Sequence, residues 1–235
     1  MSLIYFIPGT MCTEQVWQAL WPKLPDHYEL VHLNIKLSGT LDDVVGDLIA
    51  QIDSSRNNRT YSLLGFSLGG YLASAVSLKV GASLERLMVV ANTPTALPDS
   101  EMLQRKRIVA AVMKNGYSGL SASRVLSFID IKSHDDQNLI ALIQQMDKQF
   151  DEKQLAHFLV PLSTRKDLCQ CLVDKIRTIW FCWGESDQLV DPAKMQLLAQ
   201  TSPVIQAHQV AESGHFLPLE QPEKLAQLIT QWQQS

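Results

Sequence analysis

Short, strongly apolar runs alternate with longer amphipathic stretches along most of the chain. Six of these runs are rich in β-branched and aromatic residues and nearly continuous in apolar character, which is typical of strands covered on both faces. They are Leu3–Ile7, Glu29–Leu33, Tyr61–Phe66, Arg86–Ala91, Arg177–Trp183 and Val204–Val210. Four stretches between them have apolar residues at helical spacing, namely Leu41–Asp53, Leu68–Lys79, Ala193–Ala199 and Pro222–Gln231. The alternation predicts an α/β fold with about six mostly parallel strands and helices on both faces of the sheet.

The alternation stops between residues 98 and 165, where no strand pattern is found. Four helical patterns follow one another there, at Glu101–Lys114, Ser118–Phe128, Asp136–Gln149 and Lys153–Phe158. A block of helices inserted after a single strand is not expected to join the sheet. We therefore expect residues 1–97 and 166–235 to form the α/β core and residues 98–165 to form an inserted helical cap above it.

Composition and charge narrow the class of protein. The net charge of −4 over 235 residues argues against a nucleic-acid-binding protein, which normally carries an excess of basic residues. No apolar run approaches the ~20 residues of a membrane helix, and the N-terminal run lacks basic residues and is broken by Pro8 and Gly9, so neither a membrane span nor a signal peptide is expected. The four cysteines are too sparse for a disulfide scaffold, which favours reduced thiols in a cytoplasmic protein.

The segment GFSLGG carries the strongest chemical signal in the chain. Ser67 stands between the predicted strand Tyr61–Phe66 and the predicted helix that begins at Leu68. A serine on a sharp strand-to-helix turn projects its hydroxyl above the sheet, and glycines two positions to either side relieve the crowding. The helix N-terminus behind it favours developing negative charge. We interpret Ser67 as a nucleophile.

A serine nucleophile needs a base that an acid holds in place. Asp187 follows the predicted strand Arg177–Trp183, and His215 follows the last predicted strand, so both lie at the carboxyl ends of strands, where active sites of open α/β sheets gather. The order Ser, Asp, His is the order of a hydrolase with such a serine turn. Glu185 and Asp191 are alternatives for the acid, although Asp191 before Pro192 is better explained as a helix cap.

Acyl transfer also needs hydrogen-bond donors for the oxyanion. The backbone N–H of Leu68, directly after the nucleophile, is one candidate. The second is expected from the loop after the first strand, from Thr10 or alternatively Met11, because Gly9 allows this loop to approach Ser67 closely. No phosphate-binding glycine loop and no cluster with metal-ligand spacing is found, so the sequence implies neither a cofactor nor a metal.

Three further residues are candidate substrate contacts. Phe66 and Phe216 flank the nucleophile and the base, and they either line an acyl pocket or pack beneath the loops. Arg124, in a helical stretch of the expected cap, is a candidate for a substrate carboxylate; a solvated or ion-paired arginine is the alternative. The cap segment has 9 basic and 8 acidic residues, which favours an anionic substrate only weakly over a solvated surface.

Taken together, these motifs resemble the α/β-hydrolase fold family along nearly the whole core. The stretch Pro8-Gly9-Thr10, continuing through Val16-Trp17 to Leu24, is similar to the family's HG…W segment after its third strand. GFSLGG is similar to the family's nucleophile turn, GESDQLVDP to its acid loop, and SGHFLPLEQPE to its histidine loop followed by the last helix. The resemblance implies Ser67 as nucleophile, His215 as general base and then acid, and Asp187 as the partner of His215. It also implies that the cap determines substrate choice.

The sequence departs from the family pattern in three places. Pro8 stands where the family usually has histidine, and the segment from Leu33 to Gly39 is a shortened loop without its aspartate. Because the first strand begins at residue 3, the two antiparallel strands that usually open the sheet have no residues to form them. We therefore expect a trimmed, six-stranded sheet.

The resemblance leaves several reactions open. The cap segment after the fourth strand is similar to that of 3-oxoadipate enol-lactone hydrolases, and pimeloyl-ester carboxylesterases remain possible, whereas Tyr71 replaces the arginine usual in the menaquinone-pathway synthase. Ser67 argues against dehalogenases and epoxide hydrolases, which use aspartate. We expect a serine hydrolase of a small carboxylic ester, lactone or thioester, its partner being a small acyl molecule. The alternatives are a C–C bond hydrolase or lyase on the same residues, and a ligand-binding sensor with low turnover.

Overall fold

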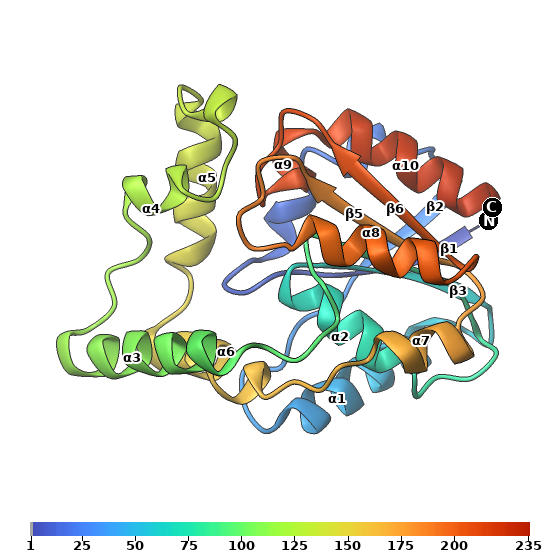
Figure 1. Cartoon of the computed structure of the whole chain (residues 1–235), viewed down its shortest axis with the longest axis horizontal. Helices are drawn as coiled ribbons and strands as arrows, with labels where there is room; N and C mark the ends of the chain where they lie inside the picture. Colours follow the sequence, from blue (N-terminus) through green and yellow to red (C-terminus); the bar gives the residue numbers. More distant parts are fainter. Residues whose placement is uncertain (1) are drawn as a thin grey trace.

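The structure, a computed structural model, describes residues 2–235 and is built on one six-stranded sheet in the order β2-β1-β3-β4-β5-β6 (Figure 1). All five neighbouring pairs of strands are parallel. The strands are β1 (Ser2–Ile7), β2 (Tyr28–His32), β3 (Tyr61–Phe66), β4 (Leu84–Val90), β5 (Ile179–Gly184) and β6 (Ile205–Val210). The predicted α/β architecture is confirmed.

Alternate residues of each strand face opposite sides of the sheet, and this divides the core in two. In β1, Leu3, Tyr5 and Ile7 pack on one side, whereas Ile4 and Phe6 pack on the other. Both sides are covered by helices, so the inner strands are buried throughout and their sequences are almost entirely apolar.

Two groups of helices cover the two faces. The helices on the Leu3 face are α1 (Leu41–Ser55), α2 (Leu68–Ser77), α7 (Cys169–Lys175) and α8 (Pro192–Thr201). Those on the Ile4 face are the 3-10 helix η1 (Glu14–Trp17), α9 (Leu217–Glu220) and α10 (Pro222–Gln234). The helices α7 and α9 were not predicted, because elements of seven and four residues are too short to show a helical period.

The chain between β4 and β5 is helical, as predicted. Its α-helices are α3 (Asp99–Asn115), α4 (Ala122–Leu126), α5 (Gln137–Asp147), α6 (Glu152–Leu159) and, back on the core, α7. Figure 1 shows α3, α4 and α5 at the end of the molecule opposite the two termini. The buried faces of α5 and α6 extend the two core clusters, α5 on the Ile4 side and α6 on the Leu3 side. A cap with boundaries at 98 and 165 stays a prediction.

The outgoing and returning segments of this helical block lie side by side. The backbone N–H of Leu168 donates to the carbonyl oxygen of Pro94 at 2.9 Å. The two ends of the helical block therefore meet the core next to each other. None of the helices within residues 2–235 combines the length and the apolar character needed to cross a bilayer.

Candidate active site

Ser67 occupies a sharp turn between β3 and α2. Its backbone has φ 52° and ψ −121°, a left-handed conformation that side-chain-bearing residues rarely adopt. Two glycines make the turn possible. A Cβ at Gly65 would lie 2.0 Å from the carbonyl oxygen of Gly69, and a Cβ at Gly69 would lie 2.2 Å from the carbonyl oxygen of Ile7. The turn therefore depends on the spacing G-x-S-x-G.

Replacing Gly69 with alanine is expected to lower the free energy of unfolding by at least about 3 kcal/mol, because the new methyl group meets the fixed backbone of β1. The matched control is Gly46→Ala on α1, where a Cβ meets nothing within 4 Å. That exchange is expected to stabilise the protein by about 0.5–1 kcal/mol, since alanine is the better helix former. Chemical denaturation of the two variants measures both effects, and equal midpoints would contradict the close packing at Gly69.

The structure brings together the three residues that the sequence analysis singled out. Nε2 of His215 lies 2.9 Å from Oγ of Ser67, and Nδ1 of His215 lies 2.9 Å from Oδ2 of Asp187. The Asp187 side chain is fully buried, and its second oxygen, Oδ1, accepts the backbone N–H of Leu189 at 2.8 Å. A proton can therefore pass from the serine hydroxyl to the imidazole, while the carboxylate holds the ring in the orientation this requires.

The two alternative acids do not contact His215. Glu185 is exposed to solvent. Asp191 caps α8, where its side chain accepts the backbone N–H groups of Ala193 and Lys194 at 3.1 and 3.3 Å. The interpretation of Asp191 as a helix cap is confirmed.

The loop after β1 contacts Ser67. A Cβ at Gly9 would lie 3.0 Å from two ring carbons of Phe66 and 3.1 Å from Cβ of Ser67, so a larger residue here would press on the Ser67 turn. The turn is closed by the Cys12 N–H, which donates to the Gly9 carbonyl oxygen at 3.2 Å. Within residues 2–235, the N–H groups of Thr10, Met11 and Leu68 donate to no protein acceptor. These donors remain available to a substrate oxygen.

Three phenylalanine rings surround His215. The ring centroids of Phe66 and Phe216 lie 5.3 and 6.0 Å from that of His215, and both side chains are buried. The ring centroid of Phe128, a residue that the sequence analysis did not single out, lies 6.2 Å from that of His215. Arg124 is exposed, and its guanidinium carbon lies 4.4 Å above the Phe128 ring rather than against the base. The expected cap thus supplies one wall of the site through Phe128.

A partly buried carboxylate connects this wall to the histidine loop. Both oxygens of Glu220 accept the Gly214 N–H at 3.0 Å, and one of them also accepts the Asp130 N–H at 2.7 Å. The backbone N–H of His215 donates to the Phe128 carbonyl oxygen at 2.6 Å. Burial raises the pKa of the Glu220 carboxyl against the opposing effect of these donors. The sequence analysis did not single out Glu220, because one of its hydrogen-bond partners, the Asp130 N–H, lies 90 residues earlier in the chain and no local pattern indicates this contact.

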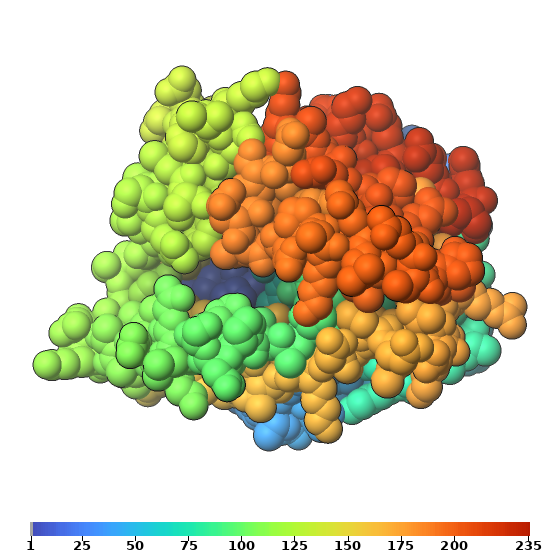
Figure 2. Space-filling view, viewed as in Figure 1, coloured from blue at the N-terminus to red at the C-terminus, as the bar shows by residue number. Residues whose placement is uncertain are grey.

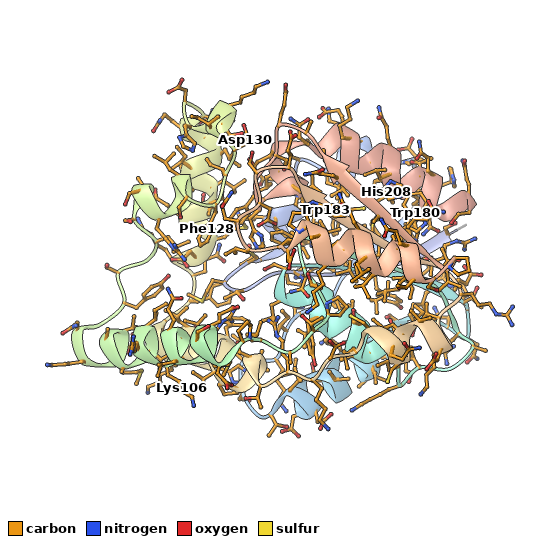
Figure 3. The ribbon with its side chains drawn as sticks, viewed as in Figure 1. Lys106, Phe128, Asp130, Trp180, Trp183 and His208 are labelled. Atoms are coloured by element: carbon orange, nitrogen blue, oxygen red, sulfur yellow. The ribbon has the colours of Figure 1, made fainter. Side chains whose placement is uncertain are left out.

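The acid loop joins the same network. The hydroxyl of Ser186 donates to Oδ2 of Asp130 at 2.5 Å, and this bond lowers the pKa of the Asp130 carboxyl. Figure 3 shows Asp130 where the segment after α4 meets the core. The segment Phe128–Asp130 is therefore hydrogen-bonded to the loop that carries His215 and to the loop that carries Asp187.

Glu220→Gln is expected to lower the free energy of unfolding by about 2 kcal/mol. In the wild type the backbone N–H groups of Asp130 and Gly214 donate to carboxylate oxygens of Glu220, whereas in the variant one of them would face the amide nitrogen, which cannot accept a hydrogen bond. Glu223→Gln is the control: Glu223 is exposed and paired only with Lys23, so we expect a change within about 0.5 kcal/mol. Urea denaturation measures both variants. Two equally stable variants would show that the Glu220 hydrogen bonds contribute nothing.

A hollow lies on the face shown in Figure 2, between α3 and the segment that follows β5. The N-terminal segment, dark blue in that view, forms part of its floor. The part of this segment that contacts Ser67 is the loop at Gly9. Within residues 2–235, no three His, Cys, Asp or Glu side chains gather in a group that could hold a metal ion.

Comparison with known proteins identifies related sequences and folds. The alpha/beta hydrolase family matches residues 4–228. No curated protein sequence matches the chain significantly. The chain is similar to a thermophilic esterase from Thermogutta terrifontis, with a TM-score of 0.87 and 20% identity over 100% of this chain and 90% of the esterase.

Two further solved structures have the same fold. The enol-lactonase from Burkholderia xenovorans LB400 has a TM-score of 0.84 and 14% identity over 100% of this chain and 92% of its own. The meta-cleavage product hydrolase from Pseudomonas fluorescens IP01 has a TM-score of 0.79 and 16% identity over 100% of this chain and 91% of its own. At these identities the likeness shows a common fold.

Proposed function

Because the chain belongs to the alpha/beta hydrolase family, we propose that it is a serine hydrolase that cleaves a small carboxylic ester, lactone or thioester through an acyl-enzyme. One observation carries the proposal: two hydrogen bonds of 2.9 Å connect Ser67 to His215 and His215 to the buried Asp187. A hydroxyl, an imidazole and a carboxylate in this order form the arrangement that activates serine for acyl transfer.

In the proposed reaction, Oγ of Ser67 attacks the substrate carbonyl carbon while Nε2 of His215 takes the hydroxyl proton. The N–H groups of Leu68 and Thr10 hold the oxyanion, with Met11 as the alternative to Thr10. His215 then gives its proton to the leaving oxygen or sulfur, and an acyl-enzyme remains. A water molecule then attacks the carbonyl carbon of the acyl-enzyme while His215 takes one of its protons. The bond between this carbon and Oγ of Ser67 breaks, the carboxylic acid is released, and His215 returns the proton to Oγ.

A C–C bond hydrolase is the second candidate. The likeness to the meta-cleavage product hydrolase supports it, because that protein shares the fold over the whole of this chain. The same serine, histidine and aspartate would then cleave a bond next to a ketone. Analysis of products from a vinylogous diketone and from a simple ester separates the two candidates.

The proposal is tested by initial rates on a short-chain p-nitrophenyl ester, a five-membered lactone and a thioester. We expect turnover of at least one of these substrates without added metal or cofactor. A protein that is folded and labelled by a fluorophosphonate but turns over none of them would favour the ligand-binding alternative. The cytoplasmic location inferred from the sparse cysteines stays part of this proposal.

A further inference from the structure

A tyrosine on the nucleophile helix clamps the segment by which the helical block returns to the core. Tyr71 lies four residues after Ser67, which corresponds to a rise of about 6 Å along α2. Its hydroxyl donates to the carbonyl oxygen of Lys166 at 3.0 Å and accepts the Lys166 N–H at 2.9 Å. Residues 164–167 are therefore fixed over the first turn of the helix that begins at the nucleophile.

This clamp brings an arginine onto the tyrosine ring. The guanidinium carbon of Arg165 lies 4.8 Å from the centroid of Tyr71, whose side chain is almost fully buried. The Nε–H of Arg165 donates to the carbonyl oxygen of Leu162 at 3.3 Å. Within residues 2–235 its two terminal nitrogens donate to no protein acceptor, and it forms no salt bridge. Four N–H donors of a half-buried cation are thus left for another molecule.

A second arginine adds to the positive charge at this junction. Arg105 of α3 donates to Oγ of Ser163 at 2.7 Å and is paired with Glu101 at 2.7 Å. One carboxylate therefore faces two guanidinium groups. Burial and the charge of Arg105 lower the pKa of Arg165 to about 10. An anion bound between Arg165 and the solvent would offset both the lost hydration and the repulsion.

We infer that Arg165 binds a carboxylate of the substrate, so that the natural substrate is an ester, lactone or thioester with a second, anionic end. The inference rests on the proposed function for the reacting end alone. A guanidinium stacked on an aromatic ring is held in one plane, and its parallel N–H donors match the two oxygens of a carboxylate. The Arg165 guanidinium carbon lies over the ring of Tyr71, whose backbone is one helical turn from Ser67. The helix α3, which carries Arg105, borders the hollow in Figure 2.

The test compares two esters of similar length that differ in charge, mono-p-nitrophenyl glutarate and p-nitrophenyl valerate. In Arg165→Gln we expect kcat/KM for the glutarate ester to fall by about 10- to 100-fold, the range for losing a hydrogen-bonded charge pair, and kcat/KM for the valerate ester to change less than about threefold. Arg165→Lys is expected to recover part of the loss. Arg107→Gln, an exposed arginine on α3, is the matched control and should leave both rates unchanged.

A second measurement does not depend on turnover. Glutarate is titrated calorimetrically into Ser67→Ala and into the double variant Ser67→Ala/Arg165→Gln. Binding that is lost in the double variant supports the subsite even where neither ester is hydrolysed, in which case only the proposed reaction fails. Equal losses for the charged and neutral esters, no loss for either, or glutarate binding that is absent or unaffected by Arg165→Gln, would overturn the inference.

Discussion

Ser67→Ala is expected to abolish labelling by a fluorophosphonate and to lower kcat on any ester substrate by about 10⁵- to 10⁶-fold. The hydroxyl at 2.9 Å from His215 is the group that would form the covalent bond, and an alanine methyl group cannot replace it. Because alanine keeps the Cβ, the left-handed backbone at position 67 remains as strained as before. We therefore expect a folded protein with nearly unchanged stability. Intact-mass spectrometry after incubation with the probe, together with initial rates, measures the effect.

Ser74→Ala provides the matched control for this variant. Ser74 lies on the same helix and is also buried, but its hydroxyl donates to the carbonyl oxygen of Gly70 rather than to a base. Its adduct and its rate should equal those of the wild type. An unchanged rate or an unchanged adduct mass in Ser67→Ala would end the proposal of a serine hydrolase. A small residual rate would agree with it, since oxyanion binding alone retains about 10³- to 10⁴-fold acceleration over water.

Asp187→Asn is expected to lower kcat by about 10⁴-fold, the effect of the same exchange in a known Ser-His-Asp site. The environment of the side chain explains why. The Leu189 N–H donates to Oδ1, so an asparagine will keep its oxygen at that position and turn its amide nitrogen toward Nδ1 of His215. The amide then donates to Nδ1, the proton of the neutral ring moves to Nε2, and Nε2 can no longer accept the proton of Ser67.

The control for this exchange is Asp191→Asn. Asp191, which follows Asp187 in the same loop, caps the N-terminus of α8, and asparagine caps helices about as well as aspartate. We expect its activity to stay within about twofold of the wild type. Activity of Asp187→Asn within tenfold of the wild type would show that the carboxylate does not set the orientation of His215.

In the proposed reaction Ser67 and Asp187 act on one step, so their effects on the rate should not add. The double variant Ser67→Ala/Asp187→Asn is expected to be no slower than Ser67→Ala alone, since the base has no hydroxyl left to activate. Initial rates of the three variants on one ester test this. A further loss in the double variant would assign Asp187 a role outside the chain of hydrogen bonds to Ser67.

Much of the core follows from local sequence. The strands and long core helices were predictable because a sheet covered on both faces requires continuous apolar runs, and its helices require a helical period. The turn at Ser67 was predictable because steric conflict leaves only glycine at positions 65 and 69. Ser67, Asp187 and His215 could be placed at the carboxyl ends of strands, since parallel strands bring those ends to one edge.

What the sequence could not give is the relation between segments far apart in the chain. The short helices α7 and α9 carry no period of their own, and packing against the sheet stabilises them. Phe128 comes to lie beside His215 because Glu220, some 90 residues away, accepts hydrogen bonds from both segments. Arg124, prominent in the sequence, instead covers the outer side of the Phe128 ring.

The sequence by itself therefore determined the sheet, the turn at Ser67 and the places of Ser67, Asp187 and His215 at the ends of strands, because each depends on neighbours within a few positions of the chain. Only the tertiary structure decided which groups surround them. Arg165 acquires its unpaired donors because Tyr71, 94 positions earlier, fixes the returning segment above α2. Long-range hydrogen bonds and burial determine the shape and charge of the site, and the local pattern of apolar and polar residues predicts neither the hydrogen bonds nor the burial.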